Sequence, residues 1–484
     1  FADGRVNPNR LPGLTNVPAA GLPVRIDNYR FVDAGFQRVN ADNYQTRFLV
    51  GVKGERWGFN WDGALLYSEA WASDVSNSVS STLLQTSLAR STPDAYNPFN
   101  GGCLDITSVG DCTPSSGTAI DSIVFELKRE TRTSLASIDL RASRQDLIDL
   151  PAGPLGIAFG AELRSETQED DRDPRVDGTQ VFTDAVTREI TGSDAAPVSP
   201  NPDAKGDRTI GAAYIELAVP VVSEEMNIPL VNSLEFQLAG RAENYSDFGG
   251  VAKPKIAMAW DLFDGLRVRA SYSQGFRAPN LEQLNVPLIT RNTTGTDLIR
   301  CEADLRARRI TDFTRCANGL NFSRRVAGNP DLAPEESENE SVGIVFQPRF
   351  LPEAAGDLTV TVVYWRIRQT GIVGILGPDV SIALDYRQRL AGGSNPNVIR
   401  SAPNADDVTF FAGTGLAPAG RIIAVNDQFV NLLPQTVRGL DIGLLWDVDD
   451  TPLGDFTLRF NASQFLEFNR EPGPIVDELL AARP

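Results

Sequence analysis

Hydrophobic and polar residues alternate with a period of two in many segments of this chain. In 266–273, every second residue is apolar, and the residues between them are Arg or Ser. The segments 155–166, 234–243 and 456–463 show a similar alternation. Successive side chains of a β-strand point to opposite faces of the sheet. The alternation therefore predicts strands that have one apolar face and one polar face.

This period predicts an all-β fold with twelve strands. Several of them are much longer than the roughly 5–6 residues that are usual in soluble sheets. The twelve strands are predicted at approximately 44–54, 57–72, 131–148, 155–169, 208–222, 232–247, 252–262, 266–275, 338–348, 357–369, 435–447 and 455–468.

The connections between the predicted strands tend to alternate in length. The turns near 55, 151, 226, 264, 352 and 451 are short, and only 248–251 is short among the others. The long loops are 73–130, 170–207, 276–337 and 370–434. A soluble sandwich has no reason to place all long loops at one end, whereas an outer-membrane barrel has short periplasmic turns and long extracellular loops. The pattern therefore predicts an antiparallel transmembrane β-barrel whose apolar face meets lipid.

Composition and charge exclude several classes of function. The 484 residues carry a net charge of −18 and include no His. Nucleic acid is not an expected partner, because binding to phosphates needs a basic surface. Without His, the chain can form no Ser-His-Asp or Cys-His nucleophile system and no zinc site with a His ligand. No pair of carboxylates stands out from the acidic background, so the sequence predicts no enzyme activity, no cofactor and no metal site.

The four Cys residues fall into two local pairs, Cys103 with Cys112 and Cys301 with Cys316. Neither pair has the spacing of a zinc ribbon or of a redox motif, and both lie in polar stretches. This arrangement predicts two disulfides in an oxidising compartment, each stabilising its loop by roughly 2–3 kcal/mol. The alternative is four free thiols in a cytosolic protein.

Several stretches resemble the β-barrel of TonB-dependent receptors from the outer membrane of Gram-negative bacteria. The clearest are SYSQGFRAPNLEQL at 271–284 and GNPDLAPEESENESVGIVFQ at 328–347, which occur in the order and at the distance typical of the family. Weaker similarities are LGIAFGAELRSE at 155–166, the region 213–250, VRGLDIGLLWDV at 437–448 and YNPFNGG at 96–102. Together these similarities cover about residues 96–448.

The resemblance implies a barrel of about 22 strands closed around a plug. Residues 1–484 would form about twelve of those strands, as the middle of a longer receptor whose plug is absent from this chain. The implied function is active, TonB-dependent uptake of a scarce nutrient such as a siderophore, a corrinoid or an oligosaccharide. A passive porin on a similar barrel is the main alternative; an outer-membrane enzyme and a secreted adhesin are two others.

The resemblance also implies partners. The TonB complex would act through the plug outside this chain, and the barrel would contact outer-membrane lipid and lipopolysaccharide. A small-molecule substrate would bind on the extracellular side, and a surface lipoprotein is a further candidate partner.

A cluster of arginines in the loop 276–337 is the candidate substrate-binding site. Seven Arg and three acidic residues in 300–325 give a local charge of +4 in a strongly acidic chain. Guanidinium groups bind carboxylates and phosphates well, so contact with an anionic substrate is expected. The alternatives are a solvated loop and contact with lipopolysaccharide phosphates. The seven residues are Arg300, Arg306, Arg308, Arg309, Arg315, Arg324 and Arg325.

Three further arginines are candidates for contact with the plug. Arg267, Arg269 and Arg277 lie on the polar phase of one predicted strand. Their side chains are therefore expected to point into the lumen, where they could pair with carboxylates of the plug.

Overall fold

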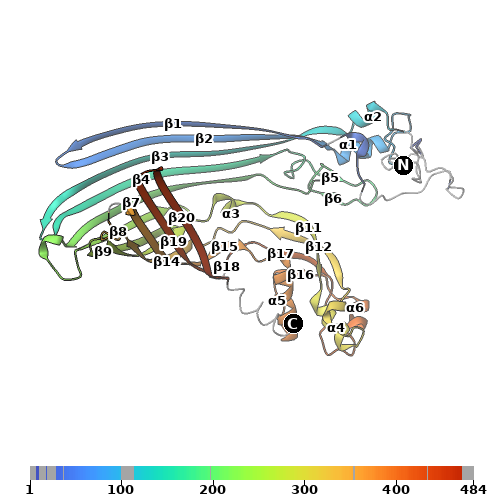
Figure 1. The fold of residues 1–484 in the computed structure, drawn as a ribbon. Helices are drawn as coiled ribbons and strands as arrows, with labels where there is room; N and C mark the ends of the chain where they lie inside the picture. The colour runs from blue at the N-terminus through green and yellow to red at the C-terminus, as the bar shows by residue number, and fades with distance from the viewer. Residues whose placement is uncertain are drawn as a thin grey trace.

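Twelve antiparallel strands form one sheet in the computed structural model (Figure 1). The structure describes residues 7–9, 18, 29–35, 37–99, 114–196, 198–352, 355–432 and 434–470. The strands of this sheet, in spatial order, are β1 (Val39–Arg56), β2 (Phe59–Val79), β3 (Val124–Leu150), β4 (Gly153–Arg172), β7 (Ala204–Val222), β8 (Ser233–Tyr245), β9 (Gly249–Phe263), β10 (Leu266–Arg277), β13 (Glu335–Phe346), β14 (Asp357–Thr370), β19 (Gln435–Thr451) and β20 (Gly454–Arg470). All twelve predicted strands are confirmed.

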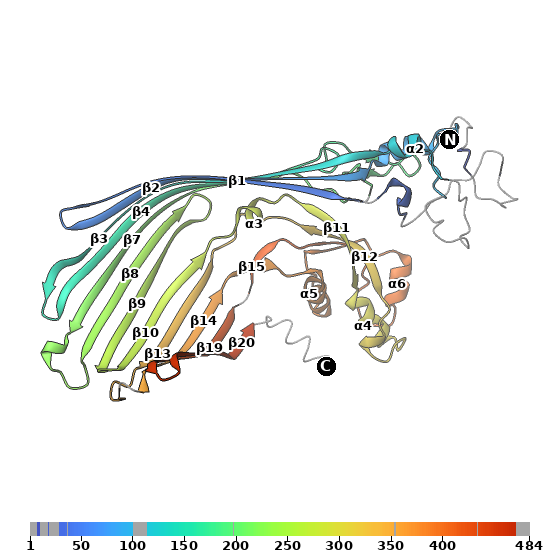
Figure 2. The same ribbon diagram turned by 45° about the horizontal axis from the view of Figure 1, so that its top comes forward.

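Each strand of this sheet pairs with the next one along the sheet, and the whole sheet is strongly curved (Figure 2). Because the pairing is antiparallel throughout, the four long loops all leave the same end, which we call the long-loop end. The opposite, short-turn end has tight connections. At the β1–β2 turn, for example, Trp57 and Gly58 both have positive φ, 55° and 75°, as in the type I′ turns that suit the twist of a hairpin. Within the described residues, β1 and β20 each pair with one strand, so the sheet is open between them.

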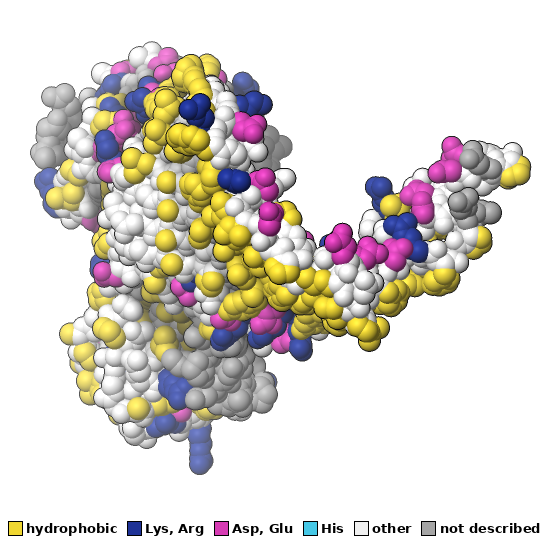
Figure 3. All heavy atoms as spheres, turned by 90° about the vertical axis from the view of Figure 1, so that its left-hand side faces the viewer, with side chains coloured by type: hydrophobic (Ala, Val, Ile, Leu, Met, Phe, Trp, Pro, Cys, Tyr) yellow, Lys and Arg dark blue, Asp and Glu magenta, His cyan; other side chains and the backbone are white. Residues whose placement is uncertain are grey.

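The register separates an apolar face of the sheet from a polar face. Phe236 stands beside Met258, which stands beside Ala270, across β8, β9 and β10. On the other face, Gln237 stands beside Ala257 in the same way. Hydrophobic side chains form a continuous band that follows the curve of the sheet, with charged side chains beside it (Figure 3). The prediction that each strand has one apolar face and one polar face is therefore confirmed.

The two loops 80–123 and 173–203 fold together into what we call the first loop unit. It contains α1 (Ser81–Leu88), α2 (Gly117–Asp121), β5 (Phe182–Thr183) and β6 (Ile190–Thr191), and η1 (Val32–Ala34) lies against α2. Its core includes Val79, Tyr96 and Ile123. The buried Asp194 accepts hydrogen bonds from the Ser80 hydroxyl at 2.6 Å and from the backbone N–H of Thr82 at 2.8 Å, which joins the two loops.

The loops 278–334 and 371–434 form a second loop unit. It contains α3 (Leu281–Asn285), β11 (Ile289–Thr296), α4 (Leu298–Arg306), η4 (Phe313–Arg315), β12 (Gly319–Val326), β15 (Ile372–Ile375), α5 (Pro378–Leu390), β16 (Val398–Arg400), α6 (Ala405–Phe411), β17 (Ile422–Asn426) and β18 (Phe429–Leu432). Four of its strands form a sheet in the order β11-β12-β17-β16, in which β12 and β17, from different loops, pair in parallel. A further short helix, η3 (Glu224–Met226), lies in the β7–β8 connection. None of the described helices is long and apolar enough to cross a membrane.

Candidate functional site

The second loop unit folds over the polar face of the sheet at the long-loop end. Arg208 of β7 lies on the polar face and donates a hydrogen bond to the carbonyl oxygen of Pro279 at 2.8 Å. Helix α3 packs so closely on β7 that a Cβ atom at Gly206 would lie 2.6 Å from Nδ2 of Asn285. Pro279 and helix α3, where this unit begins, therefore lie on the polar side of the strands.

The second loop unit has an apolar core to which both of its loops contribute. Its two clusters of buried side chains are Ile299, Ala303, Tyr386, Phe411 and Ala419, and Phe322, Ile382, Val398, Ile422 and Val425. Burial of apolar surface on this scale stabilises a defined structure. The two loops therefore form one folded unit instead of separate solvated segments.

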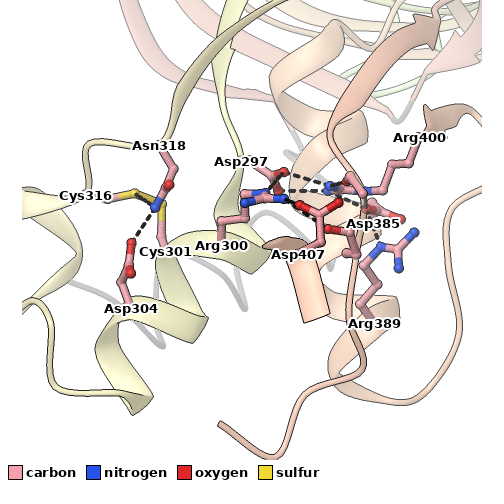
Figure 4. A network of polar contacts seen from close by, with 12 residues as sticks. Asp297, Arg300, Cys301, Asp304, Cys316, Asn318, Asp385, Arg389, Arg400 and Asp407 are labelled. Carbon is pink, nitrogen blue, oxygen red and sulfur yellow. Dashed lines mark hydrogen bonds and ion pairs between the residues drawn. A yellow bond between two sulfur atoms is a disulfide. The ribbon is translucent and has the colours of Figure 1, made fainter. Parts of the chain in front are cut away.

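Buried ion pairs join the two loops of the second unit (Figure 4). Arg400, only 5% exposed, donates to both oxygens of Asp297 at 2.7 and 2.8 Å and to Asp385 at 2.9 Å. Burial alone would lower the pKa of Arg400, but the bonds to Asp297 and Asp385 outweigh burial and raise it. Beside them, Arg300 pairs with Asp407. All of these carboxylates are almost fully buried, so the pairs hold the unit together.

The predicted disulfide between Cys301 and Cys316 is confirmed, with a Cα–Cα distance of 5.4 Å. It links α4 to the residue that follows η4. The predicted pair Cys103 and Cys112 lies outside the described residues. One loop of the second unit is therefore closed covalently at the place where the arginines cluster.

Replacing Cys301 and Cys316 by Ser should destabilise the second loop unit by about 2–3 kcal/mol, because the unfolded loop regains its freedom. Hydrogen exchange of the backbone amides in α4 measures the change, because it reports the free energy of local opening. Reduction of the native protein should reproduce the effect of the two substitutions. Unchanged exchange rates in both samples would contradict this prediction.

Five of the seven clustered arginines form ion pairs with carboxylates of the second loop unit. Within the part of the chain that the structure describes, Arg308 and Arg325 form none. Arg308 is exposed, whereas Arg325 is partly buried. The five pairs are Arg300–Asp407, Arg306–Glu302, Arg309–Asp304, Arg315–Asp312 and Arg324–Asp427. Much of the positive charge in 300–325 is therefore neutralised inside the unit.

Sequence reasoning missed the partners that come from the other loop. Asp407 and Asp427 lie about a hundred positions away from Arg300 and Arg324. The pair of Glu302 with Arg306 could have been recognised, because residues four apart are neighbours on a helix surface.

The three arginines of β10 all lie on the polar face. Arg267 donates to both oxygens of Asp261 at 2.6 and 2.8 Å, and Arg277 pairs with Glu335 at 2.8 Å. Arg269 lines a hollow of about 550 Å³ on the polar face, together with Glu235. Contact of these residues with a plug stays a prediction.

A row of ion pairs runs along the polar face toward the long-loop end. The sequence analysis did not predict these pairs. The pairs are Arg241–Glu162 at 3.2 Å, Arg208–Glu166 at 2.6 Å and Arg129–Asp170 at 2.7 Å. These pairs join neighbouring or next-nearest strands on one face. The polar wall beneath the loops is thus lined with fixed charges.

Residues 2–474 match the protein family described as "TonB dependent receptor-like, beta-barrel". The chain therefore belongs to this family, whose fold explains the long two-faced strands and the single end that carries the long loops. In a barrel of this kind, the apolar face is the one that meets lipid and the polar face lines the lumen.

Individual relatives cover the chain to different extents. The probable TonB-dependent siderophore receptor PirA of Acinetobacter baumannii is 28% identical over 149 residues, which make up 30% of this chain and 16% of PirA. The crystal structure of the siderophore receptor PirA from Acinetobacter baumannii aligns with 89% of this chain, with 15% identity and a TM-score of 0.47. The structure of the RagAB peptide transporter also aligns with 89% of the chain, with 10% identity and a TM-score of 0.44. This chain spans 45% of the PirA structure and 37% of the RagAB chain.

Proposed function

We propose that this chain forms the wall and the extracellular loops of an outer-membrane receptor that takes up a scarce nutrient actively, driven by TonB. The observation that carries the proposal is the match to the TonB-dependent receptor barrel over residues 2–474. The complete barrel then has about 22 strands closed around a plug. TonB acts on that plug, which lies outside this chain, in the outer membrane of a Gram-negative bacterium.

The transported molecule belongs to a class such as siderophores, corrinoids or oligosaccharides. Siderophores are the first class to test, because the relative PirA is named a siderophore receptor. Among the clustered arginines, Arg308 and Arg325 are the preferred candidates for contact with an anionic substrate, since neither forms an ion pair within the described residues. A passive porin is less favoured, because the second loop unit folds over the polar face at the long-loop end.

Uptake should depend on TonB. We expect cells that produce the complete receptor to accumulate one compound from a panel of labelled ferric siderophores, cobalamin and oligosaccharides. The same cells without TonB should lose this uptake, because transport of a scarce nutrient against its gradient needs energy. Cells that lack the receptor are the control. Uptake that persists without TonB would overturn the proposal and favour a passive channel.

A further inference from the structure

The two loop units meet at a cavity of about 400 Å³, which we call the seam pocket. Arg172 at the end of β4 and Asn201 of the first loop unit line one side, and Arg291 of β11 in the second loop unit lines the other. Nη1 of Arg291 donates a hydrogen bond across the seam to the carbonyl oxygen of Pro200 at 3.0 Å. Sites between separately folded units are common places for ligands to bind.

Two guanidinium groups line the seam pocket, and that of Arg291 has unused donors. Arg291 forms no ion pair within the described residues; the acceptors of its Nη1 are the backbone carbonyls of Pro200 and Thr290. Arg172 donates to Asp170 at 2.6 Å and to the side-chain oxygen of Asn201 at 3.0 Å, and its buried Nε has no partner among the described residues. Within the described residues, Nε and Nη2 of Arg291 form no hydrogen bond, so they are free to donate to an anion in the pocket.

The cations that line the seam pocket, Lys128, Arg129, Arg172 and Arg291, outnumber its one carboxylate, Asp173. Burial lowers the pKa of Arg291, and the positive charge of Arg172 lowers it further. Two carboxylates lie close by: Asp170 is shared between Arg172 and Arg129, which it binds at 2.7 and 3.0 Å. Asp173 lines the pocket, and its oxygens accept hydrogen bonds from the backbone N–H groups of Lys128 and Arg175 at 3.3 and 3.0 Å. A water molecule could accept the free hydrogen bond, but only an anion would also relieve the repulsion between the two guanidinium groups.

We propose that the seam pocket binds an anionic group, a carboxylate or a phosphate, of the molecule that the receptor transports, through Arg172 and Arg291. Guanidinium forks match the geometry of both anions. The side chain of Arg172 remains 22% exposed, so an anion can reach it from solvent. Because Arg172 belongs to β4 of the main sheet and Arg291 to the second loop unit, the bound anion would also fasten this unit to the sheet. This assignment rests on the proposed transport function.

The test uses calorimetry on the purified complete receptor in detergent, with citrate and inorganic phosphate as probes and the uncharged triamide of citrate as the neutral counterpart. We expect at least one anion to bind, the triamide not to bind, and R291Q to weaken binding of that anion about tenfold, since each charge-assisted hydrogen bond contributes substantially. The matched control is K205Q, which removes one positive charge near the same end. Lys205 is 72% exposed and lies on the opposite face of the sheet, so K205Q should change affinity less than twofold.

Two results would overturn the proposal: neither anion binds, or R291Q binds the anion as tightly as the native protein does. If R291Q does not fold, as judged by its heat-modifiable mobility on gels, R291K replaces it. R291K keeps the positive charge but loses the guanidinium group that can donate two parallel hydrogen bonds to one anion. We therefore expect R291K to bind the anion several-fold more weakly than the native protein. Binding is measured without TonB. A receptor that does not transport its substrate can therefore be distinguished from a seam pocket that does not bind an anion.

Discussion

Replacing Arg400 by Met should destabilise the second loop unit by about 3–5 kcal/mol, the usual cost of removing one partner from a buried ion pair. The substitution removes the cation that Asp297 and Asp385 share. Asp385 keeps its pair with Arg389 at 2.8 Å, and Asp297 keeps only the longer contact with Arg300 at 3.6 Å. The side chains of Asp297 and Asp385 are 2% and 0% exposed, so solvent cannot replace the lost bonds. Because Asp297 precedes α4 and Asp385 lies in α5, the two loops of the unit should loosen from one another.

Hydrogen exchange of the amides in α4 and α5 measures this loss, because it reports local opening as a free energy. The matched control is Arg315→Met, which removes an arginine that is 73% exposed and pairs with Asp312 at 3.7 Å. An exposed pair of this kind contributes about 0–1 kcal/mol, so the control should exchange almost as slowly as the native protein. Equal exchange in the two variants would show that Arg400 does not hold the unit together.

The strands of the main sheet could be predicted because their signal is local. A period of two over ten or more residues fixes which side chains share a face, and the register then pairs apolar with apolar positions. Phe236, Met258 and Ala270 meet in this way across three strands. The disulfide of Cys301 and Cys316 was predictable for the same reason, since its two members lie only 15 positions apart.

The loop units could not be predicted, because their contacts join segments far apart in the chain. Nothing near Arg300 indicates that Asp407 is its partner, and nothing near Arg172 indicates that Arg291 lies across the same cavity. The cluster of arginines and three of its acidic partners were visible in the sequence, and folding supplied two more, Asp407 and Asp427. The net charge counted along one loop therefore overestimates the positive charge near a ligand, because carboxylates from the other loop pair with some of the arginines.

Replacing Leu238 by Arg should destabilise the barrel by about 2–4 kcal/mol if the side chain lies near the middle of the bilayer, the cost of placing this charge in hydrocarbon. Leu238 lies on the apolar face, where its neighbours across the two adjacent strands are Leu217 and Ile256. No acidic side chain stands directly beside it on these strands to pair with the new charge. The measurement is the temperature at which the receptor loses its compact, heat-modifiable form on gels, which should fall.

The matched control for Leu238→Arg is Gln237→Arg, one residue away on the polar face. Gln237 donates a hydrogen bond to Glu216, so an arginine there would meet a carboxylate and solvent instead of lipid. The control should therefore keep the transition temperature of the native receptor within the error of the assay. If Gln237→Arg lowered the temperature more than Leu238→Arg, the apolar face would not be the one in lipid, and the assignment of the polar face to the lumen would be reversed.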